Sequence, residues 1–194
     1  MVSHAPSSPP LDAAALADAI RARRSIELYE PGPVDEAVVR EAIEVARWAP
    51  NHRLTQPWRF YLIGPETRAA IADLVGTIET RNKGERVGAV KRARVASMPG
   101  MLVLTSQRSE DELLDREDYA ACCCAAQNLM LYLWQRGVGS KWTTGAVTRE
   151  AAFFELLGID AERERVVGLF WLGRPKVVPV QKRREPEEII AERP

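Results

Sequence analysis

The sequence is poor in histidine, with two in 194 residues, and this scarcity excludes several kinds of catalytic site. His4 lies in a start rich in Ser and Pro, so a histidine-based zinc site is nearly excluded, and a Ser-His-Asp triad would have to use His52. No G-x-S-x-G nucleophile elbow occurs, and neither a G-x-G-x-x-G nor a G-x-x-x-x-G-K-[ST] phosphate loop is present. With so few acid-base groups, chemistry carried by a bound cofactor is favoured.

The chain also lacks an excess of one charge and any long apolar run. Lys plus Arg and Asp plus Glu both number 27, so no overall basic field would attract nucleic acid or an anionic membrane. No apolar run reaches the roughly 18 residues of a membrane span, and the start resembles no secretion signal. The adjacent Cys122, Cys123 and Cys124 are interpreted as small buried hydrophobic residues. We expect a cytoplasmic protein with no metal, nucleic-acid or membrane partner.

Hydrophobic spacing predicts one domain at residues 11–194, behind a disordered leader at residues 1–10. Helices are predicted at 11–23, from the N-cap Asp35 to about Ala49, from Pro65 toward Thr80, and at 118–136. The last of these is apolar nearly all round, which indicates burial on several sides. Strands are predicted at 58–63, 101–105 and 165–172, with a short apolar strand before residues 142–145.

Three other segments have weaker patterns. The stretch 81–94 is basic and contains two glycines, which predicts a mobile surface segment that could act as a lid. The acid pairs Glu117-Asp118 and Glu187-Glu188 are interpreted as solvated helix ends. The tail from Gly173 is too polar and proline-rich to form its own core, so it is expected to lie on another surface.

Three separated segments contain distinctive motifs. They are RARRSIELYE from Arg21, ARWAPNHRLTQPWRFYLIG from Ala46 to Gly64, and the stretch from GVGSKWTTGAVT to REPEEII, Gly137 to Ile190. The most specific piece is the A-P-N-H-x-x-x-Q-P-W run. In their order and spacing these segments resemble the FMN-dependent nitroreductase family, in particular its compact NAD(P)H-dependent branch. The resemblance covers nearly the whole chain.

The resemblance implies a bound FMN whose phosphate lies at the end of the first predicted helix. Arg23, Arg24 and Ser25 match phosphate-contacting positions, and the guanidinium fork of Arg suits a phosphate through charge-assisted hydrogen bonds. Without the resemblance, the same arginines would suit a solvated helix C-terminus.

The tail would supply the remaining phosphate contacts. Lys182 and Arg184 match the family's C-terminal phosphate contacts, and their spacing puts both side chains on one face of an extended segment. Arg183 would then point away as a solvated charge. In the family this tail, here residues 173–194, crosses to the other subunit.

The resemblance places the flavin ring against a loop and a turn. Trp48 and His52 match flavin-contacting positions of compact members, and Gln56 lies in the same loop, residues 50–57, which in the family reaches the FMN of the other subunit. Leu54 stands where larger members often have a flavin-contacting Asn.

The turn follows the short strand. Thr143, Thr144 and Gly145 match the segment that supplies backbone N–H groups near flavin N5 and O4, and the glycine allows a close approach. A plain Thr-rich turn is the alternative. No side chain is expected to be catalytic, because the flavin carries the chemistry.

The fold implied by the resemblance is α+β, with a mixed sheet of about four or five strands surrounded by helices in an intertwined homodimer. The implied activity is hydride transfer from NAD(P)H through FMN to a small acceptor such as a nitroaromatic or a quinone. Three alternatives stay open: another reductive reaction on the same scaffold (dehalogenation, flavin breakdown or enone reduction), a non-enzymatic FMN-binding protein, and a dimeric module without flavin.

Overall fold

The computed structural model describes residues 12–193, so the predicted leader at 1–10 lies outside the described residues. The helices are α1 (Ala13–Ala22), α2 (Glu36–Ala46), α3 (Pro65–Lys83), α4 (Glu85–Ala96), α5 (Glu112–Gln135) and α6 (Ala151–Leu157). The strands are β1 (Trp58–Leu62), β2 (Gly100–Gln107), β3 (Gly139–Thr143) and β4 (Glu164–Gly173). Three short 3-10 turns are η1 (His52–Leu54), η2 (Ala146–Arg149) and η3 (Pro186–Glu188). None of the described helices is long and apolar enough to cross a membrane.

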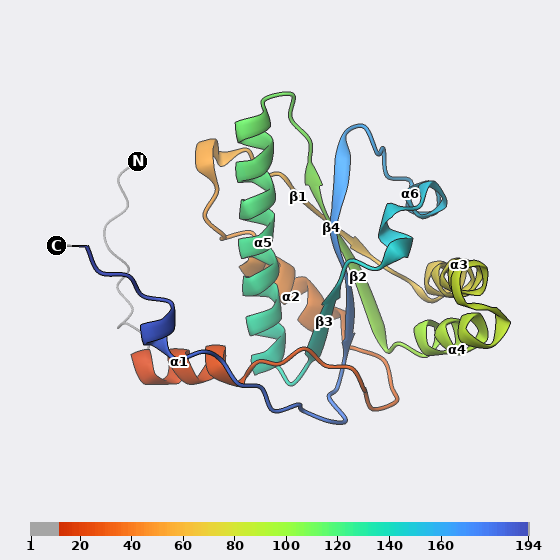
Figure 1. Cartoon of the computed structure of the whole chain (residues 1–194), viewed down its shortest axis with the longest axis horizontal. Coiled ribbons are helices and arrows are strands. Elements are labelled where there is room, and N and C mark those ends of the chain that lie inside the picture. Colours follow the sequence, from red (N-terminus) through yellow and green to blue (C-terminus); the bar gives the residue numbers. More distant parts are fainter. Residues whose placement is uncertain (1–11, 194) are drawn as a thin grey trace.

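The strands form one sheet in the order β1-β2-β4-β3, and all three pairings are antiparallel (Figure 1). The predicted α+β class and the strand number are confirmed. Among the described residues, the parallel component of the expected mixed sheet is limited to one isolated bridge, Ser25 with Ser140. The edge strands are therefore β1 and β3.

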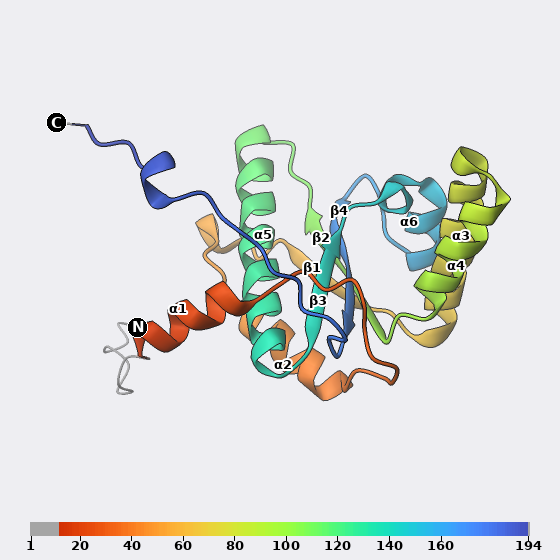
Figure 2. The ribbon, with the colours of Figure 1, turned by 60° about the horizontal axis from the view of Figure 1, so that its bottom comes forward.

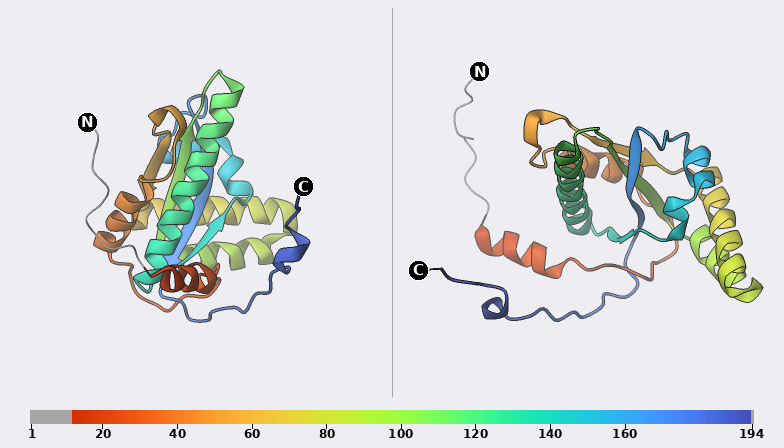
Figure 3. Two further views of the ribbon diagram at one scale, coloured as in Figure 1. Left: turned by 90° about the vertical axis from the view of Figure 1, so that its left-hand side faces the viewer. Right: turned by 45° about the horizontal axis from the view of Figure 1, so that its top comes forward.

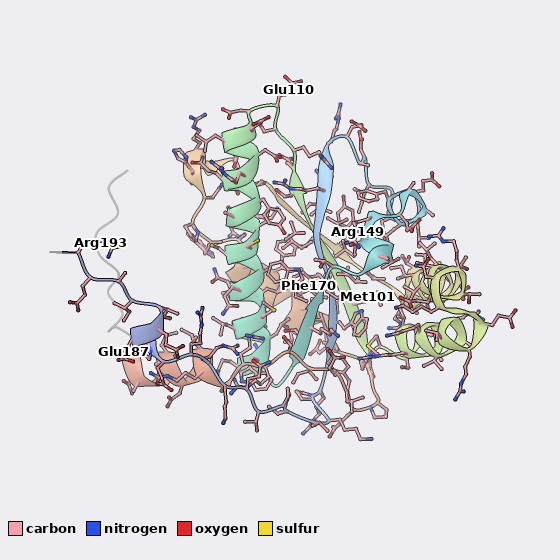
Figure 4. The ribbon with its side chains drawn as sticks, in the orientation of Figure 1. Met101, Glu110, Arg149, Phe170, Glu187 and Arg193 are labelled. Atoms are coloured by element: carbon pink, nitrogen blue, oxygen red, sulfur yellow. The ribbon has the colours of Figure 1, made fainter. Side chains whose placement is uncertain are left out.

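The sheet separates two hydrophobic cores because successive side chains of β2 point to opposite faces. Leu102 and Leu104 pack in the core with α2 and α5, whereas Met101 and Val103 pack in the core with α3 and α6. Figure 3 shows the two helical layers on either side of the sheet. Met101 and Phe170, one from each core, are labelled in Figure 4.

Aspartate side chains cap the starts of three helices: α1 at Asp12, α2 at Asp35 and α5 at Asp111. The Asp35 side chain accepts a hydrogen bond from Ala37 N over 2.9 Å, as predicted for the start of α2, which ends at Ala46 rather than near Ala49. The Asp111 side chain caps α5, so this helix begins six residues before the predicted Asp118. On α5, Cys122 is buried, but Cys123 is half-buried and Cys124 is exposed, so the prediction of three buried cysteines is only partly correct.

The prediction of a mobile segment at 81–94 is wrong, because α3 and α4 form a tight helical hairpin across it. Gly84, with φ of 89°, makes the turn between them. The helices approach so closely that a Cβ on Gly88 would lie 2.7 Å from the carbonyl oxygen of Gly76. The glycines therefore allow close helix packing rather than mobility. The short helix α6 was not predicted.

The tail after β4 first pairs with the segment that follows α1 and then leaves the body. Glu30 N donates to Arg174 O and Lys176 N donates to Leu28 O, each over 2.9 Å. Beyond Lys176, no backbone hydrogen bond joins the described part of the tail to the rest of the chain. Figure 2 shows the tail continuing past α1, and its Val180 side chain is 92% exposed.

Candidate functional site

The segment after α1 pairs with the outer edge of β3. Ser25 forms a parallel bridge with Ser140, and Ile26 N donates to Ser140 O over 3.0 Å. The Ile26 side chain is fully buried, and a Cβ on Gly139 would lie 2.6 Å from it. This close packing fixes Arg23 and its neighbours beside the beginning of β3.

Arg23 and Arg24 lie at the C-terminal end of α1 with part of each guanidinium unpaired. Arg24 Nη1 donates to the carbonyls of Arg21 and Arg23, so it also stabilises the helix end, as the alternative interpretation requires. The Nε atoms of Arg23 and Arg24 are buried with no hydrogen-bond partner among the described residues. Burial, followed by the charges of Arg24 and Arg183, lowers the pKa of Arg23. Clustered cations with unpaired buried donors favour an anion at this place.

The tail places Arg183 within electrostatic reach of this cluster. Arg183 was expected to be a solvated charge; its side chain is exposed, but its charge acts on Arg23. The side chains of Lys182 and Arg184 are exposed as well, and they make no hydrogen bond or ion pair to any residue between 12 and 193. Their predicted phosphate contacts stay predictions.

The segment Thr143, Thr144 and Gly145 lies at the far end of β3, next to a cavity of about 180 Å³. The cavity lies between the hairpin α3–α4 and the strands β3 and β4, and Thr143 and Gly145 line it. Its lining also contains three cations and an indole ring: Lys91, Arg94, Lys141 and Trp171. A partly apolar cavity with convergent cations suits a planar ligand that becomes electron-rich.

Glu27 holds two of these cations at the cavity. Lys141 and Arg94 form ion pairs with the two carboxylate oxygens of Glu27, and each cationic group lies 5.1 Å from the centre of the Trp171 ring. Burial would raise the pKa of Glu27, but hydrogen bonds from Lys141 and Arg94 outweigh it and lower that pKa. This cluster cannot be recognised from the sequence, because its members come from distant parts of the chain and share no motif.

The loop 50–57 has an unusual backbone. Arg53, Leu54 and Gln56 have φ values of 58°, 53° and 48°, in the left-handed region that few non-glycine residues adopt. The loop exposes apolar surface, since Leu54 is 78% exposed and the neighbouring Trp48 is 74% exposed. Strained backbone and exposed apolar side chains are features of binding loops.

Glu117 and Asp118 are not solvated helix ends, and that prediction is wrong. Because α5 begins at Glu112, the pair lies in the second turn of the helix, where it contacts the loop. His52 Nδ1 lies 2.7 Å from Glu117 Oε2, and Asp118 is 4% exposed and accepts a hydrogen bond from Thr55. The acids hold the loop against α5.

The predicted site residues form two groups at opposite ends of α5. The loop contacts this helix at Glu117, whereas Ser25 pairs with Ser140, just beyond the end of the helix at Gln135. Between Glu117 and Gln135 the helix rises about 27 Å, at about 1.5 Å per residue. Figure 1 shows η1 beside the upper part of α5 and β3 beside its lower part. One chain therefore does not bring the loop with His52 and Gln56 to the edge of β3, while Trp48 lies between α2 and that loop.

Comparison with known proteins agrees with this fold. Residues 20–174 match the model of the nitroreductase family. The chain belongs to the nitroreductase family. The candidate NAD(P)H nitroreductase YfhC of Bacillus subtilis (strain 168) is 32% identical over 177 residues, which cover 88% of this chain and 90% of YfhC.

Solved structures show the same nitroreductase fold. A nitroreductase-like protein from Bacillus cereus superposes with a TM-score of 0.80 and 27% identity, covering 99% of this chain and 98% of that one. A candidate nitroreductase from Desulfovibrio desulfuricans, solved in complex with FMN, has a TM-score of 0.74 and 25% identity and covers 92% of this chain and 96% of its own. Family membership indicates an oxidoreductase.

Proposed function

We propose that this nitroreductase binds FMN and uses NAD(P)H to reduce small acceptors such as nitroaromatics or quinones. The spacing along β3 carries the proposal. The unpaired arginine cluster lies beside Ser140, and Thr143, at the cationic cavity, is about 10 Å further along the strand. A phosphate would pair with the arginine cluster, and a flavin ring would fill the cationic cavity. The relative solved with FMN supports this assignment.

At the phosphate end, Arg23 would donate through its unpaired guanidinium nitrogens, while Arg24 divides its donors between the helix end and the ligand. Ser25 is exposed where it pairs with β3, and its hydroxyl would add a further donor. Lys182 and Arg184 would complete the clamp once the tail is docked. An anion would relieve the repulsion among these cations.

At the ring end, the residues of this chain would orient the flavin and stabilise negative charge on it. The backbone N–H groups of Thr144 and Gly145 donate to no described residue, so they are available to ring acceptors. Lys141 and Arg94 bring positive charge to the same cavity. When bound, FMN would supply the hydride-accepting and electron-donating chemistry.

The homodimer follows from the separation of the two groups. The loop contacts α5 through His52 and Glu117, about 27 Å along the helix from its end near the phosphate cluster, which is more than one bound flavin spans. A second copy of the chain could bring its loop to the edge of β3. The tail, whose described apolar side chains are exposed, would cover surface on that second copy.

Spectroscopy of the purified protein tests the proposal. We expect a yellow protein whose flavin is released as FMN on denaturation and is bleached anaerobically by NADH or NADPH. A panel of nitroaromatic and quinone acceptors should then restore the oxidised spectrum. Flavin that binds but resists bleaching would instead support the sequestering alternative, and a protein that takes up no FMN would refute the proposal.

A further inference from the structure

Asp118 is a buried carboxyl that the proposed chemistry does not use. It is 4% exposed and forms no ion pair with any described residue. Buried carboxylates are normally paired with a cation, because the loss of hydration is costly. Because Asp111 is the N-cap of α5, Asp118 in the second turn does not cap the helix. Its hydrogen-bond partners therefore indicate its role.

These partners form a directed chain that ends on the loop backbone. The Thr55 hydroxyl donates to Asp118 Oδ1 and in turn accepts from Asn51 Nδ2 over 2.9 Å. Asn51 Oδ1 accepts from the backbone N–H of Gln56 over 2.6 Å. Asn51 Nδ2 also lies 3.5 Å from Asp118 Oδ1. The shortest contact of the Thr55 hydroxyl is with Asp118, and a carboxylate can only accept, so Asp118 directs the Thr55 proton and leaves the hydroxyl oxygen free to accept from Asn51.

The chain spans the part of the loop whose backbone is least favourable. Arg53, Leu54 and Gln56 all have positive φ, and a loop of exposed residues would relax from that conformation unless something held it. Gln56 N donates to Asn51, which belongs to the same loop. Among the described residues, Asp118 is the one helical residue to which this hydrogen-bond chain connects.

We propose that Asp118 is a positioning residue that acts through Thr55 and Asn51 to hold loop 50–57 in its flavin-binding conformation. This inference rests on the proposed function, because the loop matters only if it meets a flavin. The carboxylate would not touch the cofactor. It would present His52 and Gln56 on a preformed surface, so that binding does not have to order the loop.

The test uses four variants of the full-length protein: Thr55→Val, Asp118→Ala, the double variant, and Asp118→Asn. FMN and riboflavin affinities are measured by fluorescence titration well below the unfolding temperature, with thermal unfolding recorded in parallel. Thr55→Val and Asp118→Ala should each weaken both flavins about tenfold and equally, because the loop contacts the ring rather than the phosphate. The double variant should lose no more than either single variant. Asp118→Asn keeps an acceptor oxygen and should restore most of the affinity.

Glu164→Gln is the matched control. Glu164 is a second buried carboxyl, 6% exposed, but its partners are Arg59, Tyr61 and Thr105, away from the loop. The Glu164→Gln variant should have a lower unfolding temperature and an unchanged flavin affinity. If Asp118 were merely structural, Asp118→Ala would show the same pair of results.

Three results would overturn the inference. Wild-type flavin affinity in Thr55→Val would do so even if Asp118→Ala failed to fold. Additive losses in the double variant would show that the two residues act separately, and a loss for FMN alone would move the effect to the phosphate. If the wild-type protein bound neither flavin, the proposed function itself would fail, which is a distinguishable result.

Discussion

Ser25 pairs with Ser140 in a parallel bridge across the outer edge of β3. This one bridge places the end of α1, with its arginines, next to the strand whose other end lines the cationic cavity. The two halves of the candidate flavin site therefore share a rigid edge strand, and their separation does not depend on a flexible loop.

The arginine cluster should bind the cofactor through its phosphate only. A hydrogen bond to a charged group contributes about 1.5–3 kcal/mol, so Arg23→Ala should weaken FMN roughly 10- to 150-fold. Lys182→Ala should do less, because a flexible ammonium makes a looser contact. Riboflavin, which lacks the phosphate, should bind almost equally to all variants in a fluorescence titration. Arg21→Ala is the control, since Arg21 is exposed on the same helix end. Equal losses for FMN and riboflavin would place Arg23 away from the phosphate.

Gly145 should be required by the ligand and not by the fold. Its φ of −58° suits any residue, and a Cβ there would meet only Thr143 Oγ1, at 3.8 Å. Gly145→Ala should therefore change unfolding stability by less than about 0.5 kcal/mol but weaken flavin binding. In contrast, Gly168→Ala should destabilise the fold by about 1–3 kcal/mol, because its Cβ would lie 2.0 Å from Trp142 Nε1. Unchanged flavin affinity in Gly145→Ala would show that the ring does not approach this turn.

The tail should matter for assembly more than for the folding of one chain. Deletion of residues 177–194 removes no backbone hydrogen bond between the described tail and the body. The shortened protein should keep its helical circular dichroism spectrum. Its dimer dissociation constant, measured by sedimentation, should rise, and it should bind FMN less tightly. A full-length protein that sediments as a monomer with FMN fully bound would contradict the shared site. So would a shortened protein that binds FMN as tightly as the full chain does.

His52 should orient the flavin or the acceptor and should not be an indispensable acid or base. Its ring lies 2.7 Å from Glu117 on an exposed loop, where water can supply protons. Loss of a hydrogen bond worth about 0.5–1.5 kcal/mol predicts a roughly 2- to 13-fold decrease in flavin reduction for His52→Ala. Glu117→Gln should have a smaller effect of the same kind. Stopped-flow bleaching measures both, and a decrease beyond about a thousandfold with FMN still bound would identify His52 as catalytic.

Stability should fall at alkaline pH because of a buried thiol. Burial raises the pKa of Cys122 from 9.0 to about 12, and burial also raises the pKa of Tyr29. A group whose pKa is raised by folding contributes its full stability below the pKa of the unfolded chain, and loses it as the pH rises. The free energy of unfolding should therefore fall by roughly 1 kcal/mol from Cys122 alone between about pH 8 and pH 10.

Urea unfolding of Cys122→Ala measures this contribution. The variant should show a correspondingly smaller fall over the same pH range, whereas Cys124→Ala, which removes an exposed thiol, should follow the wild-type curve. Identical pH dependence in wild type and Cys122→Ala would show that the thiol does not cause the loss.

The local elements and the family can be recognised from the amino-acid sequence alone. Asp35 and Pro65 begin helices by capping and by a preset φ, and the β-branched and aromatic runs at 58–63 and 165–172 form strands. These signals act between near neighbours, so they can be recognised without the fold. The motif segments led to the nitroreductase family, which the family match confirms.

Two other features depend on tertiary contacts between separate elements. The two glycines of 81–94 predict a mobile segment from the sequence. In the fold, Gly88 of α4 packs against Gly76 of α3, so the glycine serves close helix packing. The sequence pattern predicts a solvated Asp118 at a helix end. In the fold, α5 begins at its N-cap Asp111, and Thr55 contacts the buried Asp118 carboxylate.

The cationic cavity and the separation of the two site groups also came from the fold. Glu27, Arg94 and Lys141 meet only because three elements distant in sequence converge, and no spacing rule relates them. Likewise, His52 and Ser25 are kept apart by α5, which rises about 27 Å between Glu117 and Gln135. Contacts of this kind depend on the packing of the whole chain, which local patterns of residues do not specify.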